Sequence, residues 1–293
     1  MYEQIGENKR NTIILVAAFS IFIIVLAWLL GRIVFGIGSF GLAIGGIFVI
    51  VYSLVNYFYS DRIVLAISGA REVKKDEHPY LFNVIDGLSV AAGISKPKAY
   101  VINDTALNAF ATGRDPEHGI VVVTTGILQK LDRQELEGVI AHEMSHIKNY
   151  DIRLSTIVSV LVGVTALLSD VLLRATLWGH RDREQGRMGL VLLLAGVALA
   201  VLTPFIAAII NMAISRQREY LADASAALLT RNPNGLASAL AKIGGDKEVL
   251  EAANKATAHM YIDNPLKNRR SFFDGMFSTH PPIADRIARL RNM

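Results

Sequence analysis

Two long apolar stretches near the start of the chain restrict its fold more than any other feature. Residues 12–30 contain no charged side chain, and a second uncharged stretch covers residues 33–55 after the short interruption of Gly31 and Arg32. A helix needs about 20 apolar residues to cross the hydrocarbon of a bilayer, so each stretch is long enough for one crossing. We therefore predict that residues 1–60 form a transmembrane helical hairpin with a very short turn at Gly31 and Arg32.

Two later stretches have a similar character. Residues 154–173 are apolar except for their Ser and Thr residues and Asp170, and residues 189–214 are almost wholly apolar. The loop between them contains four arginines: Arg174, Arg181, Arg183 and Arg187. The length of both stretches favours two further membrane crossings, whereas the arginine-rich loop disfavours an external position. We expect residues 154–214 to cross twice, and the alternative is a helical pair that packs against the rest of the protein.

The distribution of basic residues indicates the orientation of the hairpin. Lys9 and Arg10 precede the first apolar stretch, and only Arg32 lies in the predicted turn. Four basic residues follow the second stretch: Arg62, Arg71, Lys74 and Lys75. Since cytoplasmic segments carry the excess of Lys and Arg, both ends of the hairpin are expected to face the cytoplasm. We therefore expect a multi-pass protein of the cell (inner) membrane.

Amino-acid composition limits the kinds of molecule and metal site that the protein can bind. Charged residues make up only 19% of the chain, below the roughly 25% of a typical soluble domain. The net charge of +4 comes from scattered residues without interleaved aromatic side chains, which argues against nucleic acid and favours anionic membrane lipids. The chain has no cysteine, so any metal must be held by His, Asp or Glu.

The polar middle of the chain, residues 61–153, is expected to form a small α+β domain. Pro79 suits the first turn of a helix that ends near Gly93, and residues 100–102, 108–112 and 120–124 are typical of short strands. Asp132 and Glu135 form a capping box that opens another helix. Residues 215–293 are expected to be helical and to end in an amphipathic helix. The predicted fold class is thus a mainly α integral membrane protein with a small α+β domain.

The segment His142-Glu143-Met144-Ser145-His146 carries the strongest chemical signal in the sequence. Residues four apart share one face of a helix, so both imidazoles can reach one zinc ion. Glu143 follows the first of these histidines and can take a proton from water without binding the metal itself. This H-E-x-x-H pattern predicts a zincin-like metalloprotease, with one Zn²⁺ per chain and Glu143 as its catalytic base.

A catalytic zinc ion needs a third protein ligand. Glu219 is the best candidate, because Asp223 lies one helical turn later and can orient a ligand histidine from the same face. From spacing alone, a solvated charged helix end is an equally good interpretation of these two residues. Four other histidines compete as ligands, and each stands alone in a polar stretch where a surface histidine is the simpler interpretation: His78, His118, His180 and His259.

Three ordered motifs extend the pattern: His142-Glu143-x-x-His146, then Ser215-Arg216-x-x-Glu219-x-x-Ala222-Asp223, and finally Ser278-Thr279-His280-Pro281-Pro282. Together with the hairpin and the segment Asn108-Ala109-Phe110-Ala111-Thr112-Gly113, they resemble the HtpX-like membrane metalloproteases, which are related to the CAAX prenyl proteases. The resemblance implies that Glu219 is the third zinc ligand. It also implies proteolysis of misfolded or damaged membrane proteins at a cytosolic active site, as part of stress response and quality control.

We also expect roles in substrate binding and catalysis for residues other than the metal ligands. A strand containing Asn108, Ala109 and Phe110 can receive an extended, unfolded protein substrate through backbone hydrogen bonds. His280 can donate to the oxyanion that forms during peptide attack, and Tyr220 is a rival donor. Arg216 and Tyr220, like Asp223, are expected to surround the ligands.

Two alternatives to this function remain at the level of sequence. A prenyl-protein protease of the CAAX type uses the same chemistry but usually needs more membrane spans than the four available here. A metal-binding membrane protein without hydrolytic activity would carry its polar ligands inside the spans, whereas here they lie beside them.

Overall fold

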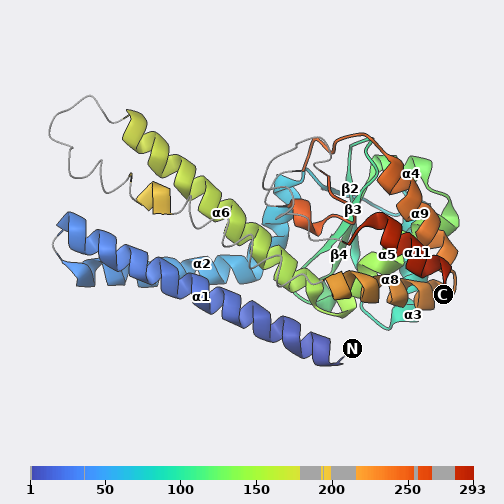
Figure 1. Ribbon diagram of the computed structural model, residues 1–293, viewed down its shortest axis with the longest axis horizontal. Coiled ribbons are helices and arrows are strands. Elements are labelled where there is room, and N and C mark those ends of the chain that lie inside the picture. Colours follow the sequence, from blue (N-terminus) through green and yellow to red (C-terminus); the bar gives the residue numbers. More distant parts are fainter. Residues whose placement is uncertain are drawn as a thin grey trace.

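The computed structural model describes residues 2–35, 37–178, 193, 195–198, 216–253, 257–265 and 281–293. Three long helices project from a rounded α+β part (Figure 1). These helices are α1 (Tyr2–Phe35), α2 (Gly38–Ile67) and α6 (Asp151–Trp178). The expectation of a mostly helical protein with a small sheet is confirmed.

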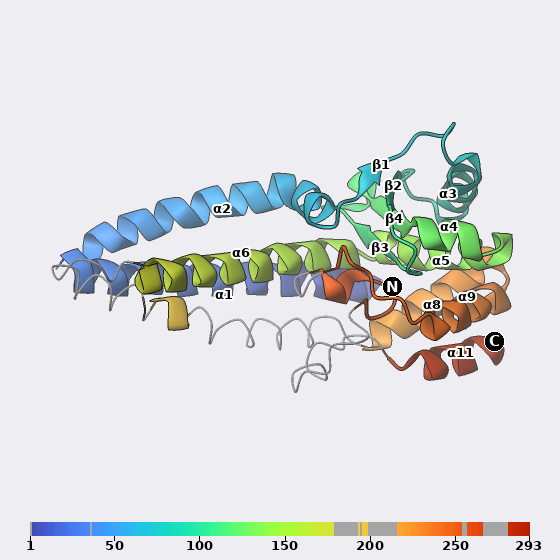
Figure 2. The same cartoon turned by 90° about the horizontal axis from the view of Figure 1, so that it is seen from above.

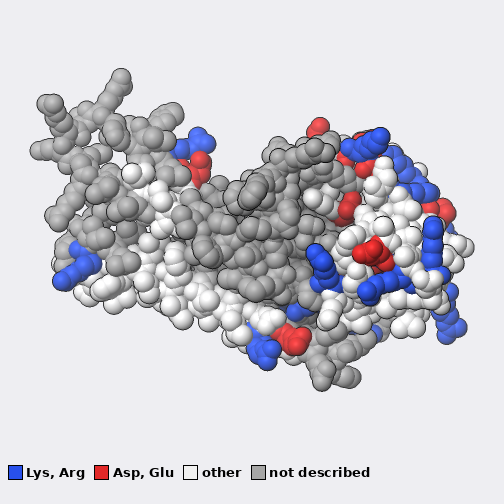
Figure 3. Space-filling view, viewed as in Figure 1, with Lys and Arg blue, Asp and Glu red and all other residues white. Residues whose placement is uncertain are grey.

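Helices α1 and α2 have the length and composition of membrane-spanning helices. Among the described residues, Lys9–Trp28 and Gly38–Ile67 are the two segments that are long and apolar enough to cross a bilayer. Large apolar side chains of α2 are exposed along its length, with Ile47 at 64% and Ile50 at 62%. The described surface between the two ends of the helical projection is almost free of charge in Figure 3.

The predicted turn at Gly31 and Arg32 is wrong, because both residues lie within α1 and the chain reverses between Phe35 and Gly38. Gly31 serves close packing instead. A Cβ atom on Gly31 would lie 2.7 Å from the Cα of Gly41, and a Cβ on Gly41 would collide with the carbonyl oxygen of Ala27. Small residues thus let the backbones of α1 and α2 approach each other, as is common between helices in membranes.

Helix α6 lies beside this pair (Figures 1 and 2). Its first half packs against α1 through a cluster of buried apolar side chains: Leu15, Phe19, Ile23, Leu154, Ile157, Val158 and Leu161. The predicted apolar helix over residues 154–173 is therefore present within α6. The other predicted apolar helix, residues 189–214, lies almost entirely outside the described residues.

The sheet contains the three predicted strands and one that was not predicted. Its order is β1-β2-β4-β3, with β2 (Lys98–Ile102) parallel to β4 (Ile120–Thr124) and with β1 (Arg71–Glu72) and β3 (Ala109–Thr112) antiparallel to their neighbours. The two residues of β1 are both exposed and have no apolar alternation, so no pattern marks them as a strand. Because β3 is an edge strand, one side of its backbone faces away from the sheet.

The remaining helices stack in layers on one another (Figure 2). They are α3 (Pro79–Ala92), α4 (Thr125–Lys130), α5 (Arg133–Lys148), α8 (Arg216–Thr230), α9 (Pro233–Gly245) and α11 (Ile283–Arg291). Two short 3₁₀ turns complete the described elements, Pro116–His118 and Ala258–Met260. Helix α5 lies between the sheet on one side and α8 and α9 on the other, so it is buried along most of its length.

Local sequence explains where the key helices begin and end. Asp132 accepts a hydrogen bond from the N–H of Glu135 at 3.0 Å, and Glu135 accepts one from the N–H of Asp132 at 2.8 Å, which confirms the predicted capping box. Helix α3 begins at Pro79 and ends before Gly93, whose φ of 66° is the left-handed conformation that glycine adopts easily. Both helix boundaries agree with the sequence prediction.

Substituting Gly41 tests the packing of α1 on α2. We expect Gly41→Leu to lower the stability of the hairpin by about 1–3 kcal/mol, because the added side chain has no space beside Ala27. Gly46→Leu is the matched control, since a Cβ there meets no atom within 4 Å. Thermal unfolding of both variants in detergent measures the difference. Equal melting temperatures for the two variants would contradict the close approach.

Candidate metal centre

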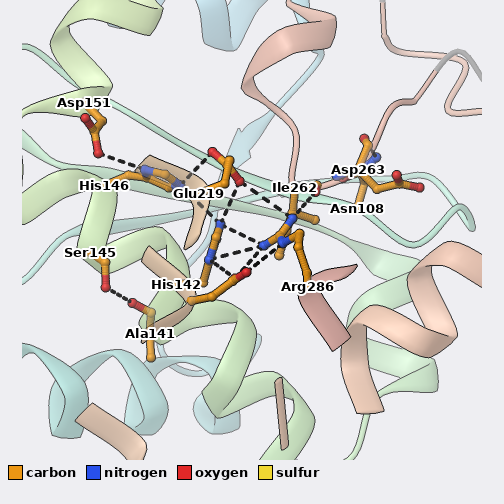
Figure 4. A network of polar contacts seen from close by, with 11 residues as sticks. Asn108, Ala141, His142, Ser145, His146, Asp151, Glu219, Ile262, Asp263 and Arg286 are labelled. Atoms are coloured by element: carbon orange, nitrogen blue, oxygen red, sulfur yellow. Dashed lines mark hydrogen bonds and ion pairs between the residues drawn. The ribbon is translucent and has the colours of Figure 1, made fainter. Parts of the chain in front are cut away.

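Three side chains from two helices converge beside the sheet (Figure 4). Helix α5 carries His142 and His146 one turn apart, and their Nε2 atoms lie 3.1 Å from each other. Helix α8 packs against α5 and contributes Glu219, with Oε2 3.6 Å from Nε2 of His142 and Oε1 3.5 Å from Nε2 of His146. His142 and Glu219 are 1% and 2% exposed, so water reaches neither freely.

This arrangement fits a zinc ion. Ligand atoms bound tetrahedrally at about 2.0–2.1 Å from one zinc ion lie roughly 3.3–3.5 Å apart. The three separations between the side chains are 3.1, 3.5 and 3.6 Å, and the candidate ligand atoms all lie within 4.8 Å of one another. Two imidazole nitrogens and one carboxylate also form a donor set that is common at catalytic zinc sites.

The outer nitrogen of each imidazole contacts a carboxylate. Nδ1 of His142 lies 3.0 Å from Oδ1 of Asp223, and Nδ1 of His146 lies 3.0 Å from Oδ2 of Asp151. Asp223 is one turn beyond Glu219 on α8, and Asp151 is the first residue of α6. A proton on each Nδ1 leaves the lone pair of Nε2 directed toward Glu219, which is the tautomer that metal binding requires. The sequence suggested Asp223 for this position but not Asp151.

Arg286 of α11 was not predicted as part of the site, although it is fully buried. Its Nε and one Nη donate to the two oxygens of Asp223 at 2.9 and 2.7 Å, and its other Nη donates to the carbonyl of Ile262 at 3.1 Å. That second Nη also lies 3.6 Å from Oε2 of Glu219. One signal in the sequence could have indicated it, since Arg286 lies between Ile283 and Leu290 on the apolar face of the last helix.

Negative charge predominates around the two rings. Four carboxylates and two guanidinium groups lie at the site: Glu143, Asp151, Glu219, Asp223, Arg218 and Arg286. With both rings neutral and all four carboxylates ionised, two negative charges are left without a positive counterpart, and a divalent cation would balance them. The chemistry of the surroundings therefore agrees with the geometry of the ligands.

The pKa values of the rings follow from these surroundings. Burial lowers the pKa of His142 to about 4, against the opposing effect of Asp223. Burial also disfavours the charged form of His146, but its contact with Asp151 and the carboxylates of Glu219 and Glu143 raise its pKa to about 9. Burial would raise the pKa of Asp223, yet Arg286 and His142 hold that pKa well below its usual range. The carboxylates around His146 therefore favour a positive charge at that ring, whereas burial disfavours one at His142.

Glu143 lies on α5 beside the three candidate ligands and lines the same cavity. Its side chain is 2% exposed, and this burial raises the pKa of its carboxyl to about 7, with a smaller opposing effect of a hydrogen bond from the backbone of Ala111. A carboxylate with a pKa near neutrality can both accept and return a proton under ordinary conditions.

The edge strand β3 runs past this cavity. Ala111 lines it, whereas Ala109 does not. The carbonyl of Ala109 accepts a hydrogen bond from the N–H of Ile262 at 2.9 Å. The side chain of Asn108 precedes the strand and donates to the carbonyl of Asp263 at 3.0 Å. The ring of Phe110 packs on a tyrosine of the same later segment. Of the residues in and next to the predicted substrate strand, Ala111 is therefore the one that faces the cavity.

Several expected neighbours of the ligands lie elsewhere. Arg216 is exposed at the start of α8, and Arg218, which lies 3.7 Å from Asp151, lines the cavity in its place. The expectation for Arg216 is therefore wrong. Arg216 comes two positions before Arg218 on α8, and residues two apart on a helix point in nearly opposite directions. The ring of Tyr220 lies beneath the guanidinium of Arg289 at 3.7 Å, and it is not among the residues that line the cavity.

The competing histidines differ in their surroundings. His118 is exposed and contacts Asp115, and His78 is partly buried just before α3. His259 is only 7% exposed and lines the cavity, so its interpretation as a surface histidine is wrong. His180 and His280 lie outside the described residues.

Substituting Arg286 tests its role in the core of the site. We expect Arg286→Met to lower the free energy of unfolding by about 3–5 kcal/mol, because Asp223 would keep a buried charge without its guanidinium partner. Arg291→Met, on the exposed end of the same helix, is the matched control and should change it little. Chemical unfolding of the two variants gives the comparison, and equal stabilities would contradict a structural role for Arg286.

Comparison with known proteins identifies the family of the chain. Residues 74–293 match the family model described as peptidase family M48. The whole chain is 50% identical to a protease HtpX homolog of Dictyoglomus thermophilum and covers 94% of it. It is 43% identical to the protease HtpX homolog of Caldanaerobacter subterraneus subsp. tengcongensis and covers 98% of that protein.

Among solved structures, the crystal structure of S. mikatae Ste24p matches 99% of the chain at 17% identity and a TM-score of 0.49, and the chain spans 66% of its length. The motifs at His142 and Glu219 lie within the region that the family model matches. The chain therefore belongs to peptidase family M48, and within that family to the HtpX metalloproteases.

Proposed function

We propose that this protein is a zinc-dependent endopeptidase in which His142, His146 and Glu219 hold one Zn²⁺ ion. The observation that carries the proposal is the arrangement of Nε2, Nε2 and a carboxylate at separations of 3.1, 3.5 and 3.6 Å. A bound zinc ion would supply a Lewis acid for the scissile carbonyl and for water. Proton transfer and the orientation of the ligands are carried out by side chains of the protein.

Glu143 has the position and the pKa of the catalytic base. Its buried carboxylate, with a pKa near 7, removes a proton from the attacking water and returns it to the leaving amine. Asp223 and Asp151 fix the orientation of the two ligand rings through their Nδ1 atoms. Arg286 holds Asp223 in place and is a positioning residue.

We further propose that the edge strand β3 receives the substrate. An extended peptide that pairs with Ala111 lies across the cavity beside Glu143, and backbone hydrogen bonds make such binding independent of sequence. This would suit unfolded or misfolded proteins, including damaged proteins of the membrane, as substrates. The proposed substrate strand of Asn108, Ala109 and Phe110 is thereby extended to Ala111. His280 stays a proposed donor to the oxyanion, and it lies outside the described residues.

The proposed location is the cell (inner) membrane, with several crossings and with the active site on the cytoplasmic side. Lys9 and Arg10 on α1 and Arg62 on α2 support this orientation, because all three lie at the end of the hairpin that meets the α+β part. Since His146 precedes residues 154–214 and Glu219 follows them, these residues must cross the membrane an even number of times.

Glu143→Gln should abolish proteolysis while the zinc content stays unchanged. The amide keeps the shape of the side chain but cannot accept the proton, and Glu143 is not a proposed ligand. Cleavage of an unfolded protein and metal content are measured on the same preparation. Substantial remaining activity would exclude Glu143 as the base, and loss of zinc would make it a ligand.

Glu219→Ala should lose both zinc and activity, because two histidines alone hold the ion weakly. Asp223→Asn and Asp151→Asn should be milder, with zinc affinity or rate reduced roughly 10–100-fold. Asp263→Asn, a carboxylate outside the cavity, is the control. A full equivalent of zinc in Glu219→Ala would assign the third ligand to another residue, and His259, which also lines the cavity, would be the next candidate.

Cysteine labelling tests the membrane topology, because the chain has no cysteine of its own. Lys75 and Lys247 are exposed and lie before and after residues 154–214, respectively. Neither Lys75→Cys nor Lys247→Cys should react with an impermeant thiol reagent outside the cell. Gly179→Cys, between the two later apolar stretches, should react. Labelling of Lys75→Cys and Lys247→Cys on opposite sides of the membrane would contradict the three-ligand site.

A further inference from the structure

A small pocket lies where the long helices meet the α+β part, apart from the metal centre. Its walls come from α2 (Asn56, Tyr57 and Ser60), from the segment after β3 and from the first turns of α6, including Arg153. None of its lining residues lines the cavity of the metal centre. The pocket is partly open at its mouth and contains both polar and cationic groups, which is unusual between helices of such apolar composition.

Two polar groups at this pocket lack partners within the part of the chain that the structure describes. Asn56 is 5% exposed and donates from Nδ2 to the hydroxyl of Tyr52, but its Oδ1 is buried without a hydrogen bond. Nε of Arg153 is also buried without one, and the guanidinium lies 5.7 Å from the ring centre of Tyr57. Buried polar atoms without a partner are costly, so a ligand with complementary groups would be stabilising here.

The position of the pocket along the helices indicates which ligand reaches it. Residues 38–60 of α2 contain no charge, and three exposed aromatic side chains lie near the end of this stretch: Tyr57, Phe58 and Tyr59. On α6, Arg153 precedes an uncharged stretch, residues 154–169. On α1, Lys9 lies 4.4 Å from the ring of Tyr150, at the same level. Exposed aromatic side chains and cations gather at the boundary between hydrocarbon and water, where lipid headgroups lie.

We propose that this pocket binds the headgroup of a membrane phospholipid, with the phosphate on Arg153 and a neighbouring hydroxyl or ammonium donor of the same headgroup on Oδ1 of Asn56. Phosphatidylglycerol and phosphatidylethanolamine carry such a donor, whereas the quaternary ammonium of phosphatidylcholine does not. The proposal rests on the insertion of α1 and α2 in the membrane but not on any step of catalysis. A bound lipid would also hold α2, α6 and the α+β part in register at the membrane surface.

Native mass spectrometry of the full chain, released from nanodiscs, tests the proposal. Wild-type protein from phosphatidylglycerol nanodiscs should retain one lipid, and retention from phosphatidylcholine nanodiscs should be clearly lower. Arg153→Gln should reduce retention about 10-fold or more, since it removes a charge-assisted hydrogen bond. Arg62→Gln is the matched control, because Arg62 lies at the same level of α2 but does not line the pocket, and it should retain the lipid.

A second variant keeps the test independent of the folding of Arg153→Gln. Asn56→Leu keeps the branched shape of the side chain, removes its polar atoms and suits an apolar helix, and it should remove the preference for phosphatidylglycerol over phosphatidylcholine. Cleavage of an unfolded protein in detergent reports separately on the proposed function and should be unchanged in both variants. Equal retention by wild type and Arg153→Gln would overturn the proposal. Displacement of the lipid by millimolar inorganic phosphate would also overturn it, because the site would then bind free phosphate.

Discussion

The buried carboxylate of Asp223 connects the three helices that build the metal centre. It belongs to α8, contacts Nδ1 of His142 on α5 at 3.0 Å, and accepts two hydrogen bonds from Arg286 on α11. A buried charge of this kind is tolerated only when its partners are in place, so the three helices must pack together before the site exists. The same carboxylate sets the tautomer of His142, and packing and chemistry therefore depend on one side chain.

The second ligand ring depends on one of the three long helices in a similar way. Nδ1 of His146 contacts Asp151, which is the first residue of α6, and Arg218 lies 3.7 Å from the same carboxylate. Any tilt of α6 relative to α5 would change this contact. One of the long helices thus begins at a residue that orients a proposed zinc ligand, so α6 contributes directly to the metal centre.

Much of the fold follows from short patterns in the sequence. The capping box at Asp132, the boundaries of α3 and the three longer strands were predicted, because each depends on neighbouring residues. The reversal between α1 and α2 was placed wrongly, because Gly31 was interpreted as a turn residue although it serves the contact with Gly41. That contact joins residues distant in sequence, which local patterns do not reveal.

The same difference between local patterns and contacts of distant residues applies to the candidate site. The spacing of His142 and His146 predicts a shared helix face, whereas the proximity of Glu219 to both rings needed the resemblance to a family. Arg286 and Asp151 were not predicted, since each reaches the site through tertiary packing of a distant helix. A charged residue on the apolar face of the last helix was the one available sign of Arg286.

X-ray absorption at the zinc edge, on protein purified without chelator and without added metal, tests the proposed centre most directly. The arrangement of His142, His146 and Glu219 predicts one zinc ion per chain with two imidazole nitrogens at about 2.0–2.1 Å and oxygen ligands completing the shell. In Glu219→Ala, any remaining zinc should keep both imidazoles and lose the carboxylate. A wild-type spectrum with three or more imidazole ligands, or a chain without stoichiometric zinc, would contradict the centre described above.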